Sequence, residues 1–159
     1  MKVLIVSDTH RRNENYLEII KREQPLDMVI HCGDVEGSEY LIEEAAGCPT
    51  HIVLGNNDFF CELPRELEIP IGDYRAFITH GHTYYVAMGS ERIKEEAKER
   101  GCDLVFYGHT HKPMVDMDED MIAVNPGSAS YPRQDGKRPS YVIMQLHSGK
   151  SATFEIKYL

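Results

Sequence analysis

The chain has 159 residues, of which 42% are apolar, so it is long enough to bury the core of one globular domain and is not an intrinsically disordered protein. Its 17 Lys and Arg against 26 Asp and Glu give a formal net charge of −9, which argues against an extended nucleic-acid-binding surface. The apolar run Val3–Val6 is too short for a signal peptide or a membrane span, so we expect a cytoplasmic protein. The 8 histidines point to metal binding or acid–base chemistry.

The first third of the chain alternates short apolar strands with amphipathic helices. The pattern predicts strands at Lys2–Ser7, Asp27–His31 and His51–Leu54, and helices at Asn15–Glu23 and Ser38–Ala46. A strand–helix–strand–helix–strand order is typical of a parallel sheet that is covered by helices. We therefore expect an α/β fold in this part of the chain.

The remainder of the chain is richer in strands. The pattern predicts a hairpin of Leu67–Pro70 with Tyr74–Thr79, a charged helix at Ser90–Arg100 and a buried strand at Asp103–Tyr107. Two antiparallel strand pairs are expected after these, Met114–Met117 with Met121–Val124 and Tyr141–Leu146 with Ala152–Tyr158. We expect residues 1–159 to form a single domain in which two β-sheets pack together with the helices outside.

Five of the predicted strands end in polar residues that suit metal binding. In chain order these groups are Asp8-Thr9-His10, Gly33-Asp34, Gly55-Asn56-Asn57-Asp58, His80-Gly81-His82 and Gly108-His109-Thr110-His111. The carboxyl ends of parallel strands lie together, so the groups should meet in one crevice. In an extended chain, residues two apart point the same way, which predicts that Asp8 and His10 share one ion and that His109 and His111 face one pocket. Imidazole, carboxylate and amide ligands together favour Mn, Fe, Co, Ni or Zn over calcium.

The order of these groups resembles the calcineurin-like metallophosphoesterase superfamily. The chain is most similar to the small bacterial and archaeal phosphodiesterase branch, which shares the fold of retromer subunit 29, and the likeness runs from Asp8 to the turn that ends at Ser128. The resemblance implies a four-layer αββα sandwich of two mixed sheets and two divalent metal ions, with Mn favoured. By the family's pattern, one ion would be held by Asp8, His10, Asp34 and His111. The other would be held by Asp34, Asn56, His80 and His109, with Asp34 bridging.

The resemblance also implies a phosphodiesterase mechanism. Coordination by two metal ions lowers the pKa of a shared water from about 15.7 towards about 7, and the resulting hydroxide would attack phosphorus in line with the leaving oxygen. The ions would also neutralise the charge that builds on the phosphate oxygens. No covalent nucleophile is required, and the sequence contains neither a GxSxG elbow nor a P-loop. The expected partner is a small phosphate-ester substrate.

One position departs from the family's pattern. Many members have histidine after Gly-Asn, where this chain has Asn57, and an amide cannot protonate a leaving group at neutral pH. Asn57 can still hydrogen-bond a phosphate oxygen. Between the two histidines of the fourth group, the resemblance selects His80 as the ligand, and we expect His82 to contact the substrate or to support the ligands. The departure favours phosphodiesters with fairly good leaving groups.

Other residues have simpler interpretations. Three histidines inside or at the edges of strands, His31, His51 and His147, are expected to be structural. The four cysteines form no CxxC pair and are expected to be reduced thiols. Phe59 and Phe60 are expected to fill the core rather than to line the mouth of a substrate site.

Two alternative functions stay open at this stage. A non-catalytic protein-binding scaffold of the same fold would typically have replaced its metal ligands, whereas all seven ligand positions are filled here. A phosphomonoesterase or nucleotidase would use the same ligands, but 159 residues leave little room for a capping domain that selects the substrate. The resemblance also implies that homo-oligomers are common.

Overall fold

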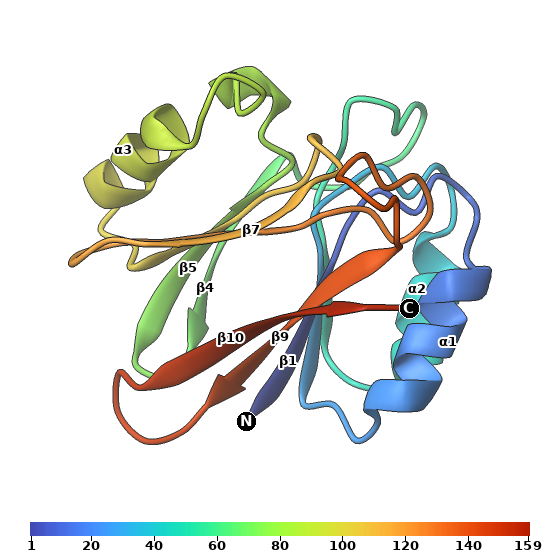
Figure 1. The fold of residues 1–159 in the computed structure, drawn as a ribbon, viewed down its shortest axis with the longest axis horizontal. Coiled ribbons are helices and arrows are strands. Elements are labelled where there is room, and N and C mark those ends of the chain that lie inside the picture. The colour runs from blue at the N-terminus through green and yellow to red at the C-terminus, as the bar shows by residue number, and fades with distance from the viewer.

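Ten strands form two five-stranded mixed sheets, and the computed structural model describes residues 1–159 (Figure 1). The first sheet has the order β10-β9-β1-β2-β3, with β1 at Lys2–Val6, β2 at Met28–His31, β3 at Thr50–Ile52, β9 at Ser140–Leu146 and β10 at Ala152–Tyr158. The second sheet has the order β4-β5-β6-β8-β7, with β4 at Glu66–Ile71, β5 at Tyr74–Thr79, β6 at Leu104–Phe106, β7 at Pro113–Met117 and β8 at Ile122–Pro126.

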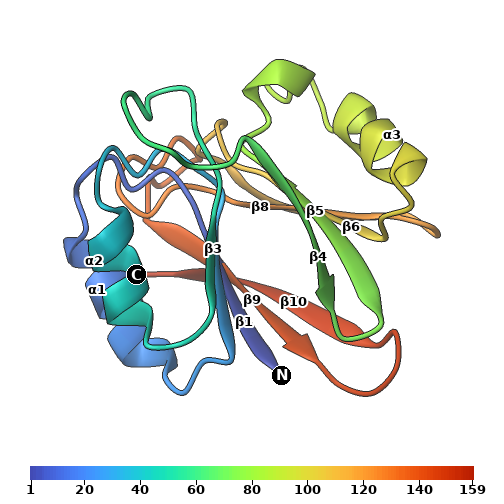
Figure 2. The same cartoon turned by 180° about the vertical axis from the view of Figure 1, so that it is seen from behind.

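Three helices cover the outer faces of the two sheets (Figure 2). Helices α1 (Glu14–Glu23) and α2 (Glu39–Ala46) lie against the first sheet, and α3 (Glu91–Glu99) lies against the second. Three groups of buried apolar residues fill the spaces, with 16 between the sheets, 14 beneath α1 and α2, and 9 beneath α3. The α/β sandwich of four layers is therefore confirmed.

Strand β1 shows why a continuous apolar run lies at the centre of this fold. Val3 and Ile5 point into the core between the sheets, whereas Leu4 and Val6 point into the core beneath α1 and α2. All four side chains are fully buried, because both faces of the strand are covered. The strand pairs in parallel with β2 and antiparallel with β9.

The predicted elements are present, and the last four strands form the two expected antiparallel pairs, β7 with β8 and β9 with β10. The two pairs lie in different sheets, β7 and β8 in the second and β9 and β10 in the first. In addition, β8 lies parallel to β6. A short 3-10 helix, η1 at His82–Tyr84, was not predicted. Ile71 belongs to β4, so the hairpin turn is Gly72-Asp73 alone.

Two aromatic residues contradict the sequence-based expectation. Phe59 and Phe60 do not fill the core, because 72% of the surface of Phe59 is exposed and Phe60 is fully exposed. They lie in the segment that follows β3, outside any helix or strand. Their position on an irregular surface loop explains the difference, since an apolar residue is buried only where a packed element covers it.

None of the helices has the length and apolar character that a membrane span requires. The four cysteines are free thiols, of which Cys32 and Cys102 are buried. His31 is fully buried, and its ring nitrogens lie 3.1 Å from Thr9 Oγ1 and 3.2 Å from the Gly33 amide nitrogen. Burial lowers its pKa to about 3, so this histidine is neutral and structural.

Candidate metal centre

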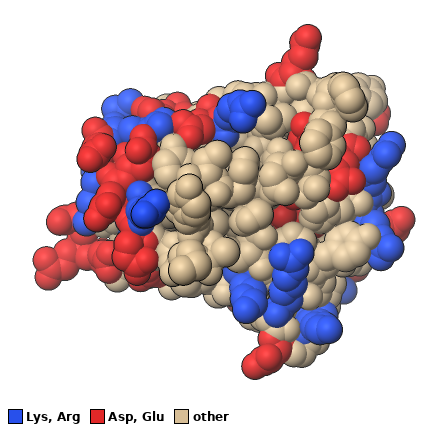
Figure 3. Space-filling view, turned by 90° about the horizontal axis from the view of Figure 1, so that it is seen from above, with Lys and Arg blue, Asp and Glu red and all other residues tan.

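The carboxyl ends of five strands meet at one edge of the sandwich, and the polar groups that follow them converge there. From the first sheet, Asp8 and His10 follow β1, Asp34 follows β2 and Asn56 follows β3. From the second sheet, His80 follows β5, while His109 and His111 follow β6. Seen from above this edge, the surface is mostly uncharged at its centre, with Lys and Arg side chains along the lower and right edges and a mixture of acidic and basic side chains at the left (Figure 3).

The backbone at these positions is not extended, which corrects the argument from residues two apart. Five of the seven predicted ligands have positive φ: Asp8 at 56°, His10 at 47°, Asp34 at 60°, His109 at 69° and His111 at 58°. Left-handed backbone is uncommon outside glycine and costs on the order of 1–3 kcal/mol per residue, so it persists only where the surroundings hold it. As a result His109 and His111 turn towards different partners rather than into one pocket.

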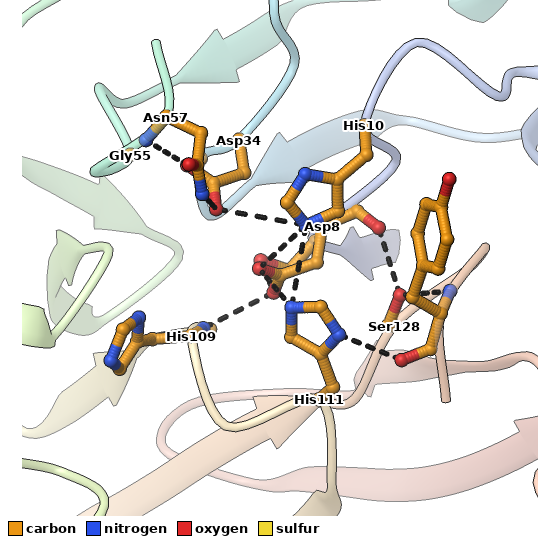
Figure 4. A network of polar contacts seen from close by, with 12 residues as sticks. Asp8, His10, Asp34, Gly55, Asn57, His109, His111 and Ser128 are labelled. Atoms are coloured by element: carbon orange, nitrogen blue, oxygen red, sulfur yellow. Dashed lines mark hydrogen bonds and ion pairs between the residues drawn. The ribbon is translucent and has the colours of Figure 1, made fainter. Parts of the chain in front are cut away.

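One group of ligand atoms surrounds Asp8. Its Oδ1 lies 3.0 Å from Nε2 of His111 and 3.8 Å from Nε2 of His10, and the two histidine nitrogens are 3.3 Å apart. Figure 4 shows both rings directed at this carboxylate. These three residues lie close enough together for one metal ion to contact all of them. Asp34 Oδ2 is 3.7 Å from His10 Nε2, which places a second carboxylate beside the group.

A second group adjoins the first. His80 Nε2 is 2.9 Å from the side-chain oxygen of Asn56 and 3.5 Å from Asp34 Oδ2, and His109 Nδ1 is 2.9 Å from the same Asn56 oxygen. Asp8, Asp34 and His80 lie within reach of one ion. Both carboxylates thus lie between the two sets of histidines, so either could bind two ions at once. The distances from Asp34 to His10 and His80 agree with its predicted bridging role.

Three of the histidines are oriented by an oxygen outside the group. Nδ1 of His10 lies 2.6 Å from Glu36 Oε1, Nδ1 of His80 lies 2.7 Å from the Cys32 carbonyl, and Nδ1 of His111 lies 2.7 Å from the Tyr131 carbonyl. A carboxylate or carbonyl oxygen only accepts, so Nδ1 carries the proton in each case. When the ring is neutral, Nε2 therefore carries a lone pair that points into the group. Histidines that bind metals are held in the same way, with one ring nitrogen donating to an oxygen and the other facing the metal.

The donor set therefore fits divalent metal ions. Oδ1 of Asp8 is fully buried and receives no hydrogen bond. It faces Nε2 of His111, and Nε2 of His10 faces the same nitrogen. When both rings are neutral, the carboxylate oxygen and the two ring nitrogens all offer electron pairs to one another, and none of them carries a proton. A cation bound between them would stabilise this arrangement.

The charges of the group shift its pKa values in opposite directions. Burial opposes the charged forms of Asp8 and Asp34, but His111 and His80 beside Asp8, and His80 and Asn57 beside Asp34, hold both pKa values below the ordinary range. The same carboxylates raise the pKa of His80 to about 9 although burial opposes its charged form. Burial, reinforced by the charge of His80, lowers the pKa of both His82 and His109.

Two glycines allow the chain to approach the carboxylates. A Cβ atom on Gly55 would lie 2.0 Å from Asp34 Oδ1, and one on Gly108 would lie 2.0 Å from Ser7 Oγ and 2.7 Å from Asp8 Oδ2. No real Cβ makes contacts this short, so these positions admit no side chain without displacing an aspartate or its neighbour.

Several residues support the ligands in ways that the sequence did not predict. Asp58 is buried and accepts hydrogen bonds from the backbone amides of Asp34, Glu36 and Gly55, at 2.8, 2.6 and 2.7 Å. Ser128 donates to the Asp8 carbonyl at 2.8 Å and lies in the turn on which the family resemblance partly rests. The sequence places Asp58 in the third polar group without indicating its contacts, and Glu36 falls in a turn, where acidic residues are common.

The two residues predicted to act on the substrate lie beside the ligands. The side-chain amide of Asn57 donates to Asp34 Oδ2 at 2.8 Å, and its backbone amide donates to Asp34 Oδ1 at 2.8 Å. The observed contact of Asn57 is therefore with a ligand, and its contact with a phosphate oxygen stays a prediction. The ring of His82 lies 5.5 Å from that of His80 and 6.0 Å from that of His109, centroid to centroid.

Comparisons with known proteins agree with this geometry. A family model described as the calcineurin-like phosphoesterase superfamily domain matches residues 1–149. A Bacillus subtilis protein named probable metallophosphoesterase YsnB is 34% identical over 149 residues, which cover 93% of this chain and 86% of that protein. The phosphodiesterase MJ0936 of Methanocaldococcus jannaschii is 33% identical over 146 residues, which cover 80% of this chain and 83% of that protein.

Solved structures show the same fold. A predicted phosphoesterase from Streptococcus pneumoniae superposes with a TM-score of 0.83 at 26% identity, covering 99% of this chain and 88% of that one. Vps29 from Entamoeba histolytica, in a single-mutant form, superposes with a TM-score of 0.81 at 22% identity, covering 100% of this chain and 99% of that one. At that identity the likeness to Vps29 concerns the fold alone.

Proposed function

Because the chain belongs to the calcineurin-like phosphoesterase superfamily, we propose that it is a metal-dependent phosphodiesterase. The observation that carries the proposal is the junction of the two sheets, where Asp8 and Asp34 stand between two sets of histidines. The phosphodiesterase activity named for MJ0936 supports the choice of a diester as substrate.

Each residue of the centre has a role in this proposal. Asp8, His10, Asp34 and His111 would hold one ion, and Asp34, Asn56, His80 and His109 would hold the other. Two bound divalent ions supply a nucleophile from water at neutral pH and neutralise charge on the phosphate oxygens. The oxygens outside the centre keep the histidine lone pairs directed inwards, and Asn57 holds Asp34 in place through two hydrogen bonds.

We take Mn²⁺ as the metal to test first, with Ni²⁺, Co²⁺, Fe²⁺ and Zn²⁺ as alternatives. The combination of imidazole, carboxylate and amide oxygen suits all of these first-row ions. The ion that gives the highest turnover at equal free concentration identifies the preferred metal.

The test is hydrolysis of bis(p-nitrophenyl) phosphate by the purified, metal-loaded protein. We expect turnover in the presence of Mn²⁺, and we expect Asp34→Asn to lower kcat/KM at least about 100-fold, because it weakens the shared ligand of both ions. Asp73→Asn, in the β4–β5 turn, is the matched control and should retain wild-type activity. An Asp34→Asn variant with wild-type turnover would refute the bridging role.

The alternative functions, the location in the cell and the oligomeric state are each tested by a separate measurement. If metal analysis finds no bound transition metal and no phosphate ester is turned over, the scaffold function is the better description. A monoester preference over the diester would favour a phosphomonoesterase. The free thiols suit a reducing cytoplasm, which cell fractionation tests, and sedimentation tests for a homo-oligomer.

A further inference from the structure

Two pockets adjoin the candidate metal centre. The larger, about 740 Å³, lies between the segment before α3 and the start of β7, and His109 forms part of its wall. The smaller, about 430 Å³, has His10 and His111 in its wall. In the proposed assignment His109 would bind one ion and His10 and His111 the other, so each pocket is lined by ligands of a different ion.

Arg133 is the one residue that lines both pockets. Its backbone amide donates to the His111 carbonyl at 3.0 Å, which fixes this part of the chain next to the centre. No carboxylate forms an ion pair with its guanidinium, although the protein carries more acidic than basic residues. An arginine that lines both pockets and has no ion-pair partner is suited to bind a phosphate oxygen.

The larger pocket combines apolar and polar walls. Met88 lies on its rim with 88% of its surface exposed, and Met114 and Pro113 add further apolar surface. Methionine packs favourably against planar rings. Glu91 can accept hydrogen bonds from hydroxyl groups, and Lys112 adds a second cation without an ion-pair partner. A planar base joined to a sugar matches these walls.

The smaller pocket has a more polar lining. Tyr131 lines it and meets the His10 ring edge to face at 5.3 Å, while the Arg12 guanidinium lies 4.6 Å from the centre of the Tyr131 ring. These contacts fix the tyrosine ring. Its smaller volume suits the smaller of two substituents.

We infer that the substrate is a phosphodiester whose nucleoside-sized substituent lies in the larger pocket and whose smaller substituent lies in the smaller one, with Arg133 binding the phosphate between them. The inference rests on the proposed function. It deepens that function because a phosphodiester carries two substituents on phosphorus, which can fill both pockets, whereas a monoester carries one and leaves one pocket empty.

The first test compares two esters of p-nitrophenol, thymidine 5′-(p-nitrophenyl phosphate) and p-nitrophenyl phosphate. Ala87→Trp is designed to fill the larger pocket, since Ala87 lines it and is exposed. We expect this variant to raise KM for the thymidine diester about tenfold or more and to leave monoester kinetics unchanged. Ala87→Ser, which keeps the pocket open, should resemble wild type. Equal effects of Ala87→Trp on both esters, or no effect on either, would overturn the assignment of the pocket.

The second test concerns Arg133. We expect Arg133→Gln to raise KM for both esters about 10- to 100-fold, because both carry the phosphate that it would bind. Metal content measured by mass spectrometry should remain that of wild type, which separates loss of a substrate contact from loss of a ligand. Arg22→Gln, on the exposed side of α1, is the control. An unchanged KM would remove Arg133 from the substrate site.

A third measurement separates this inference from the proposed function. Calorimetric titration of thymidine 5′-monophosphate into the metal-loaded protein reports on the larger pocket without turnover. If wild type hydrolyses neither ester, the phosphodiesterase proposal fails, but binding that weakens about tenfold in Ala87→Trp still supports the pocket. If wild type turns over the diester but Ala87→Trp binds the nucleotide equally well, the pocket assignment fails alone.

Discussion

Histidine orientation at the candidate metal centre depends on residues that do not themselves face a metal. Glu36 shows this most clearly, because its carboxylate lies 2.6 Å from Nδ1 of His10 and fixes both the ring and its tautomer. Its own backbone is held at φ 51° by the hydrogen bond from its amide to Asp58. A chain of contacts therefore runs from a turn residue to the ring that faces Asp8.

Removal of the Glu36 charge tests this chain of contacts. We expect Glu36→Gln to weaken metal binding about 10- to 100-fold, because a neutral amide makes His10 a less basic and less well oriented ligand. Competition with a metal-sensitive dye measures the affinity. Glu44→Gln, on the exposed side of α2, is the matched control. If both variants bind metal as wild type does, Glu36 does not position His10.

Gly108 offers a second test at a single residue. A methyl group there would displace Ser7 Oγ or Asp8 Oδ2, so Gly108→Ala should weaken metal binding at least about tenfold. Gly136→Ala is the control, since nothing lies within 4 Å of its Cβ and its positive φ of 81° costs only about 1 kcal/mol of stability. A metal affinity that falls equally in both variants would show general destabilisation instead.

The backbone at the site explains why residue-level geometry was not predictable. The prediction that the ligands lie at strand ends agrees with the structure. The prediction also assumed an extended backbone at Asp8 and His111, whereas both residues have a left-handed backbone. Glycine is the strongest signal of such a conformation in sequence, whereas Asp and His adopt it too seldom for their presence to predict it. The roles of Glu36 and Asp58 depend on contacts across turns, which local patterns do not encode.

At the level of elements, periodicity predicted most of what the structure contains. Short, β-branched apolar runs such as Val3–Val6 predict strands with both faces covered, as in the interior of parallel sheets. The partners of each strand were harder to predict from the sequence. For example, β8 pairs in parallel with β6, although a hairpin joins it to β7. That choice depends on packing between sheets.

Glu23 connects helix α1 to three strands. At the end of α1 its carboxylate accepts hydrogen bonds from Tyr141 of β9 and from Lys157 of β10, each at 2.7 Å, and pairs with Lys2 of β1 at 2.8 Å. Burial opposes the charged form, but these contacts lower the pKa of Glu23 to about 2. We expect Glu23→Gln to lower the free energy of unfolding by about 1–3 kcal/mol at pH 7.

The pH dependence of that difference has a definite sign. A carboxylate whose folded pKa is below its ordinary value stabilises the fold above the ordinary value of 4.5, and the contribution disappears as pH falls to about 2. Denaturant unfolding between pH 2 and 7 should therefore show wild type and Glu23→Gln converging towards acid. Glu155→Gln, an exposed position on β10, should show no such convergence. A constant difference down to pH 2 would contradict the role of this carboxylate.

For the whole molecule, the formal charge of −9 describes the site poorly. It counts Asp8 and Asp34 as isolated negative charges, whereas two divalent ions would add four positive charges at the same place. Arg133 and Lys112 lie next to that place. An acidic protein can therefore present a locally positive surface to a phosphate ester.

The two sheets supply the ligands jointly, so metal binding should stabilise the whole fold. Asp8, Asp34 and Asn56 extend from the first sheet, and His80 and His109 extend from the second, so each proposed ion contacts both. An ion that binds only the folded chain at 100 times its Kd adds about 2.7 kcal/mol to the free energy of unfolding. We expect Mn²⁺ to raise Tm above its value in EDTA, with the rise increasing with Mn²⁺ concentration. Asp34→Asn should lose most of this response while Asp73→Asn keeps it; equal Tm values of the wild type with Mn²⁺ and with EDTA would mean that the centre does not join the sheets.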